Sequence, residues 1–216
     1  MNFRRAKQIL HRLIVPTAAL LFCCAFNQAM AQEAIGAVSR VQGEASRTAG
    51  GATQALGLNA PLFLNDVLST GDGARLEVTL TDSSRVTLGE KAKLTLDRYV
   101  FNPAAGSGTI RIGVVGAFRF VSGKVSKLAS SAVTAVTPIA AVGIRGTDFW
   151  AGPIDNQALG VLLIEGAVSV ANASGEQILN QPGQGTNIAA AGAAPGPVTF
   201  WPQDKVNRAL AAVAFR

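Results

Sequence analysis

The sequence predicts an all-β fold, a jelly-roll-like β-sandwich of short antiparallel strands followed by a short C-terminal helix. Three observations lead to this class. Short runs typical of β-strands follow one another from residue 34 to residue 188, glycine separates many of them, and helical periodicity is almost absent before residue 202. Regular short strands joined by turns are typical of sandwiches and jelly rolls.

The first 31 residues have the pattern of a secretory signal peptide. Residues 1–12 are basic and carry no acid, residues 13–26 are almost wholly apolar, and the small residues Ala29 and Ala31 flank Met30. A charged start, a short apolar middle and a small-x-small end are typical of a cleaved signal peptide. The apolar run is shorter than the roughly 20 residues that a membrane-spanning helix needs. We therefore predict cleavage after residue 31, secretion across the inner membrane and no transmembrane span after cleavage.

Cleavage changes the charge and the chemistry that remain. The whole chain has 19 basic and 13 acidic residues, and residues 1–31 hold four of the basic ones, which leaves 15 − 13 = +2. Nucleic-acid binding needs a clustered basic face, and the nearest approach to one is better interpreted as a solvated strand face: Arg111, Arg119, Lys124 and Lys127. We predict no nucleic-acid partner.

The strands are predicted from alternation and from turn residues. Residues 76–80, 86–88 and 94–96 alternate apolar and polar side chains, and the turn Asp82-Ser83-Ser84 separates the first two runs. Two alternating runs around such a turn predict a hairpin. Further strands are expected at 109–112 and 118–121, and the continuous apolar run at 161–164 is expected to lie deep.

One short pattern occurs three times along the chain. Residues 41–46, 121–126 and 164–169 each read apolar, any, Gly, any, small or branched, Ser. The spacing is irregular, so the pattern does not indicate a solenoid. A glycine within a strand pattern marks a bulge or bend, and we interpret the three copies as strand–Gly–strand corners.

The C-terminal part of the chain has a different composition. Residues 189–201 form an Ala/Gly/Pro-rich stretch that we interpret as a linker. Residues 202–216 then predict a short amphipathic helix that begins at Pro202, with an apolar stripe at Val206, Ala209, Leu210 and Val213. We expect this helix either to cover an open end of the sandwich or to dock on a partner protein.

The sequence after residue 31 contains few of the side chains that enzymes use for catalysis. Both cysteines and the single histidine lie within residues 1–31, so Cys–His and Ser–His pairs are excluded after cleavage. The acidic residues are scattered and mostly at turns, where a carboxylate usually caps backbone N–H groups. Oxygen ligands at Asn65, Asp66 and Asp72 match no calcium-loop spacing. We predict no catalytic residue, no metal site and no cofactor.

The most distinctive segment is an apolar strand with an arginine in it. Pro138 cannot donate to a sheet, so it belongs at a strand start or edge. Arg145 stands between Gly143 and Gly146, where it is either buried, with Asp148 as a candidate partner, or presented at a corner. We single out Pro138, Gly143, Ile144, Arg145, Gly146, Thr147, Asp148 and Phe149 as structural or partner-binding residues, and Trp150 as a possible ligand-facing aromatic.

This segment resembles the signature of the FecR domain family, Thr-Pro-x-Ala-x-x-Gly-x-Arg-Gly-Thr-x-Phe. The resemblance extends over about residues 35–188 and places a β domain at 32–188. It departs at Ser83, where the family commonly has glycine. FecR-type proteins are periplasmic signal transducers, and the best-known members sense an outer-membrane transporter and control a cytoplasmic sigma factor. The resemblance implies a jelly-roll β-sandwich and a periplasmic interaction module.

Two functions are compatible with the sequence. The first is a stand-alone, non-enzymatic periplasmic domain that senses or regulates through an envelope or membrane protein. The second is a glycan- or peptidoglycan-binding envelope module without a signalling role, for which the aromatic supply after residue 31 is small, with Tyr99, Trp150 and Trp201 besides phenylalanines.

Overall fold

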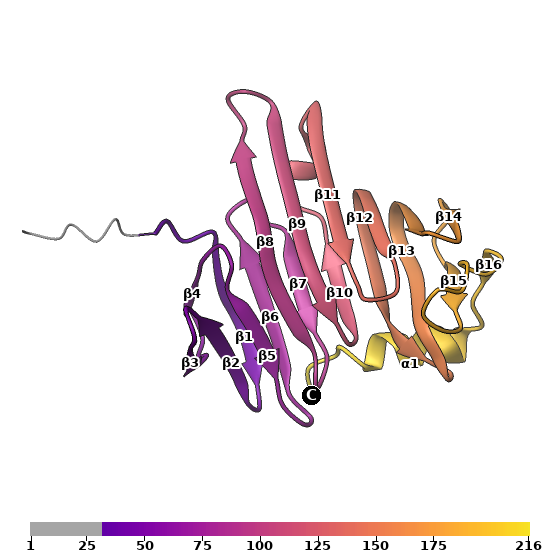
Figure 1. Cartoon of the computed structure of the whole chain (residues 1–216), viewed down its shortest axis with the longest axis horizontal. Helices are drawn as coiled ribbons and strands as arrows, with labels where there is room; N and C mark the ends of the chain where they lie inside the picture. The colour runs from indigo at the N-terminus through magenta and orange to yellow at the C-terminus, as the bar shows by residue number, and fades with distance from the viewer. Residues whose placement is uncertain (1–31) are drawn as a thin grey trace, which may run out of the picture. The chain divides into compact units, whose positions relative to one another are not determined.

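The computed structural model describes residues 32–216, so the predicted signal peptide at 1–31 lies outside the described residues. The predicted β class with a C-terminal helix is confirmed, since strands make up more than half of the described chain and only one short α-helix accompanies them (Figure 1). The elements are β1 (Gly36–Gln42), β2 (Ala45–Ala49), β3 (Ala52–Ala55), β4 (Pro61–Leu62), β5 (Val67–Thr70), β6 (Arg75–Leu80), β7 (Arg85–Leu88), β8 (Lys93–Asn102), β9 (Ser107–Val115), β10 (Phe118–Val121), the 3-10 turn η1 (Val125–Lys127), β11 (Ser130–Val136), β12 (Ala141–Ile154), β13 (Gln157–Asn172), β14 (Gly175–Leu179), β15 (Gln184–Ile188), β16 (Thr199–Phe200) and α1 (Gln203–Ala211).

All the strands belong to one hydrogen-bonded sheet that curls on itself. Its order is β3-β2-β5-β8-β9-β11-β12-β10-β7-β6-β1-β4, and β13 branches from β12 to carry β14 and β15. The sheet is mixed, because β9 and β11 run parallel. A single strongly curled half-barrel of this kind does not clearly reproduce the predicted jelly-roll sandwich of short antiparallel strands. The difference arises at the long strand β12, one part of which pairs with β11 and the other part with β10.

We call the two ends of the curl the first wing (β3, β2, β5, β8, β9 and β11) and the second wing (β10, β7, β6, β1 and β4). Residues 141–144 of β12 pair with β11, and residues 148–151 pair with β10. The long β12–β13 hairpin therefore joins the wings. Alternation along each strand turns apolar side chains into the curl, where one continuous core contains Leu76, Leu94, Ile112 and Phe120.

Of the three predicted strand–Gly–strand corners, Gly43 and Gly166 have strand on both sides, whereas Gly123 is followed by the 3-10 turn η1 and not by a strand. Gly43 has a φ of 70° and links β1 to β2, Gly123 follows β10, and Gly166 has a φ of 82° within β13. Gly123 also permits close approach, because a Cβ there would overlap the backbone of Asp82 and Ser84. The repeated pattern thus has a structural use in all three places.

The turn at Asp82-Ser83-Ser84 is a buried polar hub. The Asp82 carboxylate is fully buried and accepts hydrogen bonds from the backbone N–H of Ser84 (3.1 Å), the Ser84 hydroxyl (2.7 Å) and the backbone N–H of Val125 (3.1 Å). Ser83 has a φ of 71°, a left-handed conformation that glycine adopts without steric cost. Serine therefore stands where the FecR pattern commonly has glycine, and the turn keeps the conformation that glycine favours.

Tyr99 reaches the same hub and provides a pH-dependent signal. Its hydroxyl lies 2.7 Å from the Thr81 hydroxyl and donates to Asp82 Oδ1 at 3.3 Å. Burial raises the pKa of Tyr99 from 10.0 to about 12; the Thr81 hydrogen bond opposes the rise and the negative charge of Asp82 adds to it. Because the folded pKa is the higher one, the stabilisation is complete below about pH 10 and is lost as the pH rises towards 12.

Tyr99 is the only tyrosine of the chain, so tyrosinate absorbance reports on it alone. We expect a titration midpoint near 12 in the folded protein and near the ordinary value of about 10 in concentrated urea. Equal midpoints in the two conditions would show that the hub does not shield this hydroxyl.

The C-terminal region folds back on the β domain. The predicted linker at 189–201 is held by hydrogen bonds, among them Gly196 N–H to Asn187 O (2.9 Å) and Asn172 Nδ2 to Ala193 O (2.7 Å), and it ends in β16. The helix predicted at 202–216 is present as the shorter α1, Gln203–Ala211, with Ala209 fully buried, and Val213 of the predicted stripe lies beyond its end. It docks within the chain on the outer face of β12 and β13, rather than over an open end (Figure 1).

Candidate functional site: the bulged corner of β12 and β13

The signature segment forms a β-bulge in the long hairpin. Arg145 pairs with Ala167 and Asp148 pairs with Glu165, so Gly146 and Thr147 together oppose the single residue Gly166. A bulge of this kind bends the strand that carries the extra residue. Here the bend lies between the part of β12 that pairs with β11 and the part that pairs with β10.

Two glycines make the bulge possible. Gly146 has a φ of 61° and Gly166 a φ of 82°, a region that other residues enter only at a cost. The two positions differ in their surroundings. A Cβ on Gly166 would overlap the carbonyl oxygen of Gly146, whereas a Cβ on Gly146 would meet nothing within 4 Å.

Thr147 and Phe149 fix the corner to its neighbours. The buried Thr147 hydroxyl donates to Ala167 O at 2.6 Å, and the Thr147 N–H donates to the Ser122 hydroxyl at 2.9 Å. Phe149 is fully buried and packs edge-on against Phe118, with ring centroids 5.6 Å apart. Both residues thus have a structural use.

The arginine partner of Asp148 is Arg119, a residue that the sequence analysis did not connect with it. Arg119 Nε and Nη2 donate to the two carboxylate oxygens of Asp148 at 2.8 and 2.6 Å, a bidentate pair. These hydrogen bonds to Asp148 raise the pKa of the Arg119 guanidinium. The expectation that Asp148 pairs with a buried Arg145 is wrong, because β10 lies beside β12 and brings Arg119 to the same face.

Arg145 itself is exposed. Its side chain forms no hydrogen bond or ion pair with residues 32–216. Its backbone pairs with Ala167 in the sheet, and its N–H donates to the Thr147 hydroxyl at 3.2 Å. It borders a shallow hollow of about 410 Å³ on the outer face of β11, β12 and β13. Small residues lie along this hollow, including Thr134, Gly143 and Ser169, and Ile178 of β14 is 61% exposed beside it.

The remaining signature residues have local structural uses. Pro138 is exposed in the bend between β11 and β12, where the chain needs no N–H donor for the sheet. Gly143 allows the Ser169 hydroxyl to approach, since a Cβ would stand 2.7 Å from it. Ile144 is part of the core.

The expectation that Trp150 faces a ligand is wrong. Trp150 is fully buried and stacks edge-on with Trp201 at 6.2 Å between ring centroids. Alternation places Trp150 on the outer face of β12, but α1 covers that face and encloses both indoles together with Leu162, Ala209 and Val213.

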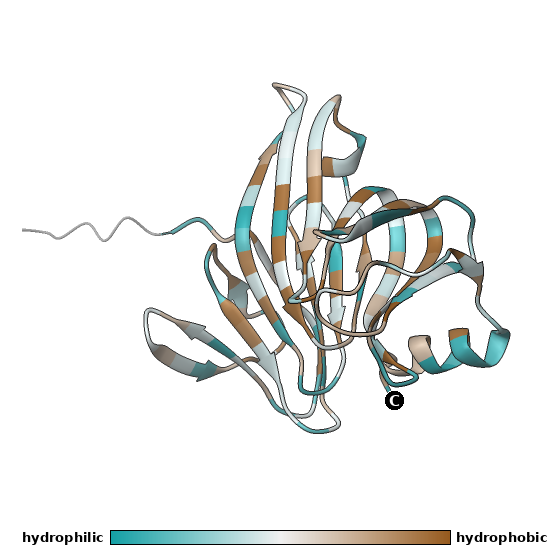
Figure 2. Cartoon of the chain, turned by 45° about the vertical axis from the view of Figure 1, so that its right-hand side comes forward, coloured by the Kyte–Doolittle hydropathy of each residue, from teal (hydrophilic) through white to brown (hydrophobic). Residues whose placement is uncertain are grey.

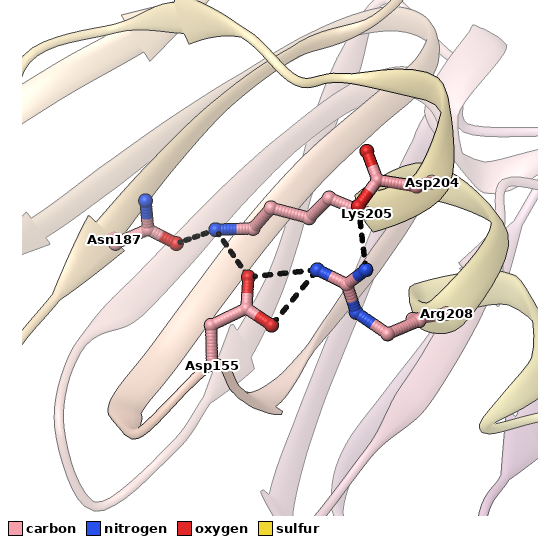
Figure 3. Close-up of polar contacts among 5 residues, drawn as sticks. All are labelled: Asp155, Asn187, Asp204, Lys205 and Arg208. Carbon is pink, nitrogen blue, oxygen red and sulfur yellow. Dashed lines mark hydrogen bonds and ion pairs between the residues drawn. The ribbon is translucent and has the colours of Figure 1, made fainter.

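A polar cluster at the β12–β13 turn holds α1 in place and was not foreseen (Figure 3). Asp155 accepts from Arg208 Nη2 at 3.0 Å and lies 3.3 Å from Lys205 Nζ, which also donates to Asn187 Oδ1 at 3.0 Å. Asp155 and Asn156 both have positive φ, 52° and 61°, so the pair Asp-Asn forms the two-residue hairpin turn. The Asp-Asn dipeptide could have predicted the turn from the sequence. No sequence signal indicates that Asp155 contacts the helix.

Within residues 32–216, no cluster of three His, Cys, Asp or Glu side chains is arranged to hold a metal ion. The described helices also include none that is long and apolar enough to cross a bilayer.

Comparison with known proteins identifies the domain. Residues 66–169 match the family model described as FecR protein, and the chain therefore carries a FecR family domain. No curated relative matches the chain.

Two crystal structures of a "putative anti-sigma factor" from Parabacteroides distasonis are similar in fold, with TM-scores of 0.53 and 0.54 at 18% and 16% identity. Each alignment covers 67% of this chain and 64% or 63% of the other, so the match spans less than two thirds of that protein's length.

Proposed function

We propose that this chain is an exported, non-enzymatic interaction domain that senses or regulates through an envelope partner protein, in signalling of the anti-sigma type. The FecR family domain and the fold shared with an anti-sigma factor candidate support the signalling class. The composition of residues 1–31 supports export to the periplasm.

The observation that carries the proposal is the exposure of Arg145. Within the signature, Gly146 is needed for backbone conformation, and Thr147 and Asp148 are engaged in hydrogen bonds within the domain. Arg145 makes no such contact with the described chain, yet a rigid bulge fixes its position beside the hollow. Arginine on a well-supported surface is frequent among residues that dominate protein–protein binding. We therefore assign partner contact to Arg145.

The glycan-binding alternative has little support, since Phe200, 62% exposed, is the one aromatic among the largely exposed apolar residues of the described chain. Sugar platforms use exposed aromatic rings, and both tryptophans are enclosed beneath α1. The Tyr99 hydroxyl is engaged with Thr81 and Asp82.

Arg145→Ala is expected to abolish partner capture while the melting temperature stays within about 2 °C of wild type, because exposed substitutions usually change stability by less than about 0.5 kcal/mol. Capture is measured by in-cell crosslinking of the tagged protein followed by mass spectrometry. Arg85→Ala is the matched control, since Arg85 is an exposed arginine outside the signature, and it should capture the partner normally.

Three results would contradict the proposal. They are equal capture by wild type and Arg145→Ala, loss of capture in both variants, or a wild type that enriches no envelope protein. Cosedimentation with purified cell-wall sacculi in the absence of any enriched protein would favour the glycan-binding alternative.

A further inference from the structure

The C-terminal segment, which we define as residues 201–216, packs on a face of the sheet where some buried polar atoms have no hydrogen-bond partner. Its apolar contacts centre on five buried residues, Trp150, Leu162, Trp201, Ala209 and Val213, with five partly buried residues packed around them. Figure 2 shows that the outward side of α1 is hydrophilic, so only one side of the helix packs on the domain.

Three buried side-chain nitrogens lack a hydrogen-bond partner within residues 32–216, and two of them lie beneath α1. These atoms are Arg75 Nε, Trp150 Nε1 and Trp201 Nε1. The two indoles lie against each other under α1. Arg75 pairs across the sheet with Gln42, whose side-chain oxygen accepts from the N–H of Arg216. A buried donor without a partner is unfavourable, so enclosing the two indoles beneath α1 carries a free-energy penalty.

The contacts that offset this penalty are mostly at the surface. Arg208 is 51% exposed in its pairs with Asp155 and Asp204, and exposed ion pairs contribute little to stability. The more buried Lys205 lies 4.1 Å from the centre of the Trp201 ring and 3.3 Å from Asp155. The Lys205–Trp201 contact lies within the segment, and the cation–π contact that joins the segment to the sheet is that of Arg40 with the Phe215 ring, 4.0 Å away. The segment is therefore held on the sheet by one cation–π contact, a few ion pairs, hydrogen bonds from the Trp201 and Arg216 N–H groups, and an apolar cluster.

We propose that this face is a helix-docking site, that the C-terminal segment is its displaceable internal occupant, and that the competing occupant is an amphipathic helix of a partner protein. The structure itself shows that the face accepts a helix with a short apolar stripe. Displacement exposes Trp150, Leu162 and Arg119, and aromatic and arginine side chains dominate protein-binding surfaces. This inference rests on the proposed interaction function and adds a second contact surface, distinct from Arg145.

The first test asks whether the segment is released separately from the sheet. Trp150 and Trp201 are the only tryptophans of the chain and both lie in this interface, so tryptophan fluorescence reports release and far-ultraviolet circular dichroism reports the sheet. We expect the fluorescence transition of the mature chain to precede the dichroism transition in a urea titration. Coincident transitions would overturn the inference and leave the Arg145 proposal untouched.

A charged substitution on the buried side of α1 tests the release of the segment more directly. Ala209 is fully buried against the sheet, whereas Ala211 is exposed on the same helix. Ala209→Asp is expected to shift the fluorescence to that of water-exposed indoles while the strand signal is retained, and Ala211→Asp should change neither signal. Loss of the strand signal in Ala209→Asp would show that the segment is an integral part of the fold.

The second test uses a dye-labelled synthetic peptide of residues 202–216 as the probe. The Ala209→Asp chain keeps the receiving face unaltered, so it should bind the peptide at least about tenfold more tightly than the wild type, in which the internal segment competes. A peptide that carries Ala209→Asp is the control and should not bind. Equal binding to the two chains, or binding to neither, would overturn the docking site.

Discussion

Asp82→Ala is expected to lower the free energy of unfolding by about 3–5 kcal/mol, because the change leaves several buried donors unsatisfied at about 1–3 kcal/mol each. The carboxylate it removes accepts from Ser84, Val125 and Tyr99. Those contacts join the β6–β7 turn to η1 and to β8, segments that lie far apart in the sequence. The loss should therefore affect cooperative unfolding of the whole sheet.

Urea denaturation followed by circular dichroism measures the effect. Asp82→Asn is the matched control, because its carbonyl oxygen still accepts hydrogen bonds, and we expect it to lose less than half as much as alanine. A loss below about 1 kcal/mol for Asp82→Ala would place this turn among ordinary surface sites.

Gly166→Ala is expected to destabilise the domain by about 3 kcal/mol or more, because overpacking adds to the cost of a left-handed residue. A methyl group there would overlap the Gly146 carbonyl, which is backbone and cannot rotate away. The bulge would have to open, and the two wings would lose their fixed connection through β12 and β13.

Gly146→Ala separates the two causes. It has a similar positive φ but open space around the Cβ position, so it should cost only about 1 kcal/mol. Thermal and urea unfolding of both variants measure the difference. Equal losses would mean that backbone conformation alone, and not the close approach at the corner, determines the requirement for glycine.

Local signals in the sequence were sufficient for the strand content, the turns and the glycine corners. Alternation in residues 76–80 and 86–88 and the turn at Asp82 correspond to β6, β7 and the loop between them. These features depend on side chains close in sequence, whose preferences act wherever the strand lies. The apolar stripe of α1 was visible for the same reason.

The pairing of distant strands could not be read in this way. The sequence suggested Asp148 for Arg145, because the two are neighbours along the chain, but the placement of β10 beside β12 gave Asp148 to Arg119. The parallel pair of β9 with β11 and the continuous curl in place of a jelly roll also depend on contacts between remote segments. Likewise, the position of α1 decided that Trp150 is buried.

By itself, the sequence determined the β class, the glycine corners and a helical C-terminal segment, because periodicity and turn chemistry are local properties, and its signature at residues 137–149 resembles the FecR family, whose model matches residues 66–169. Only the tertiary structure decided which charged groups pair, which aromatic rings are enclosed and that Arg145 remains exposed. Burial and partnership are properties of the folded arrangement, in which a side chain's neighbours come from strands far away in the sequence.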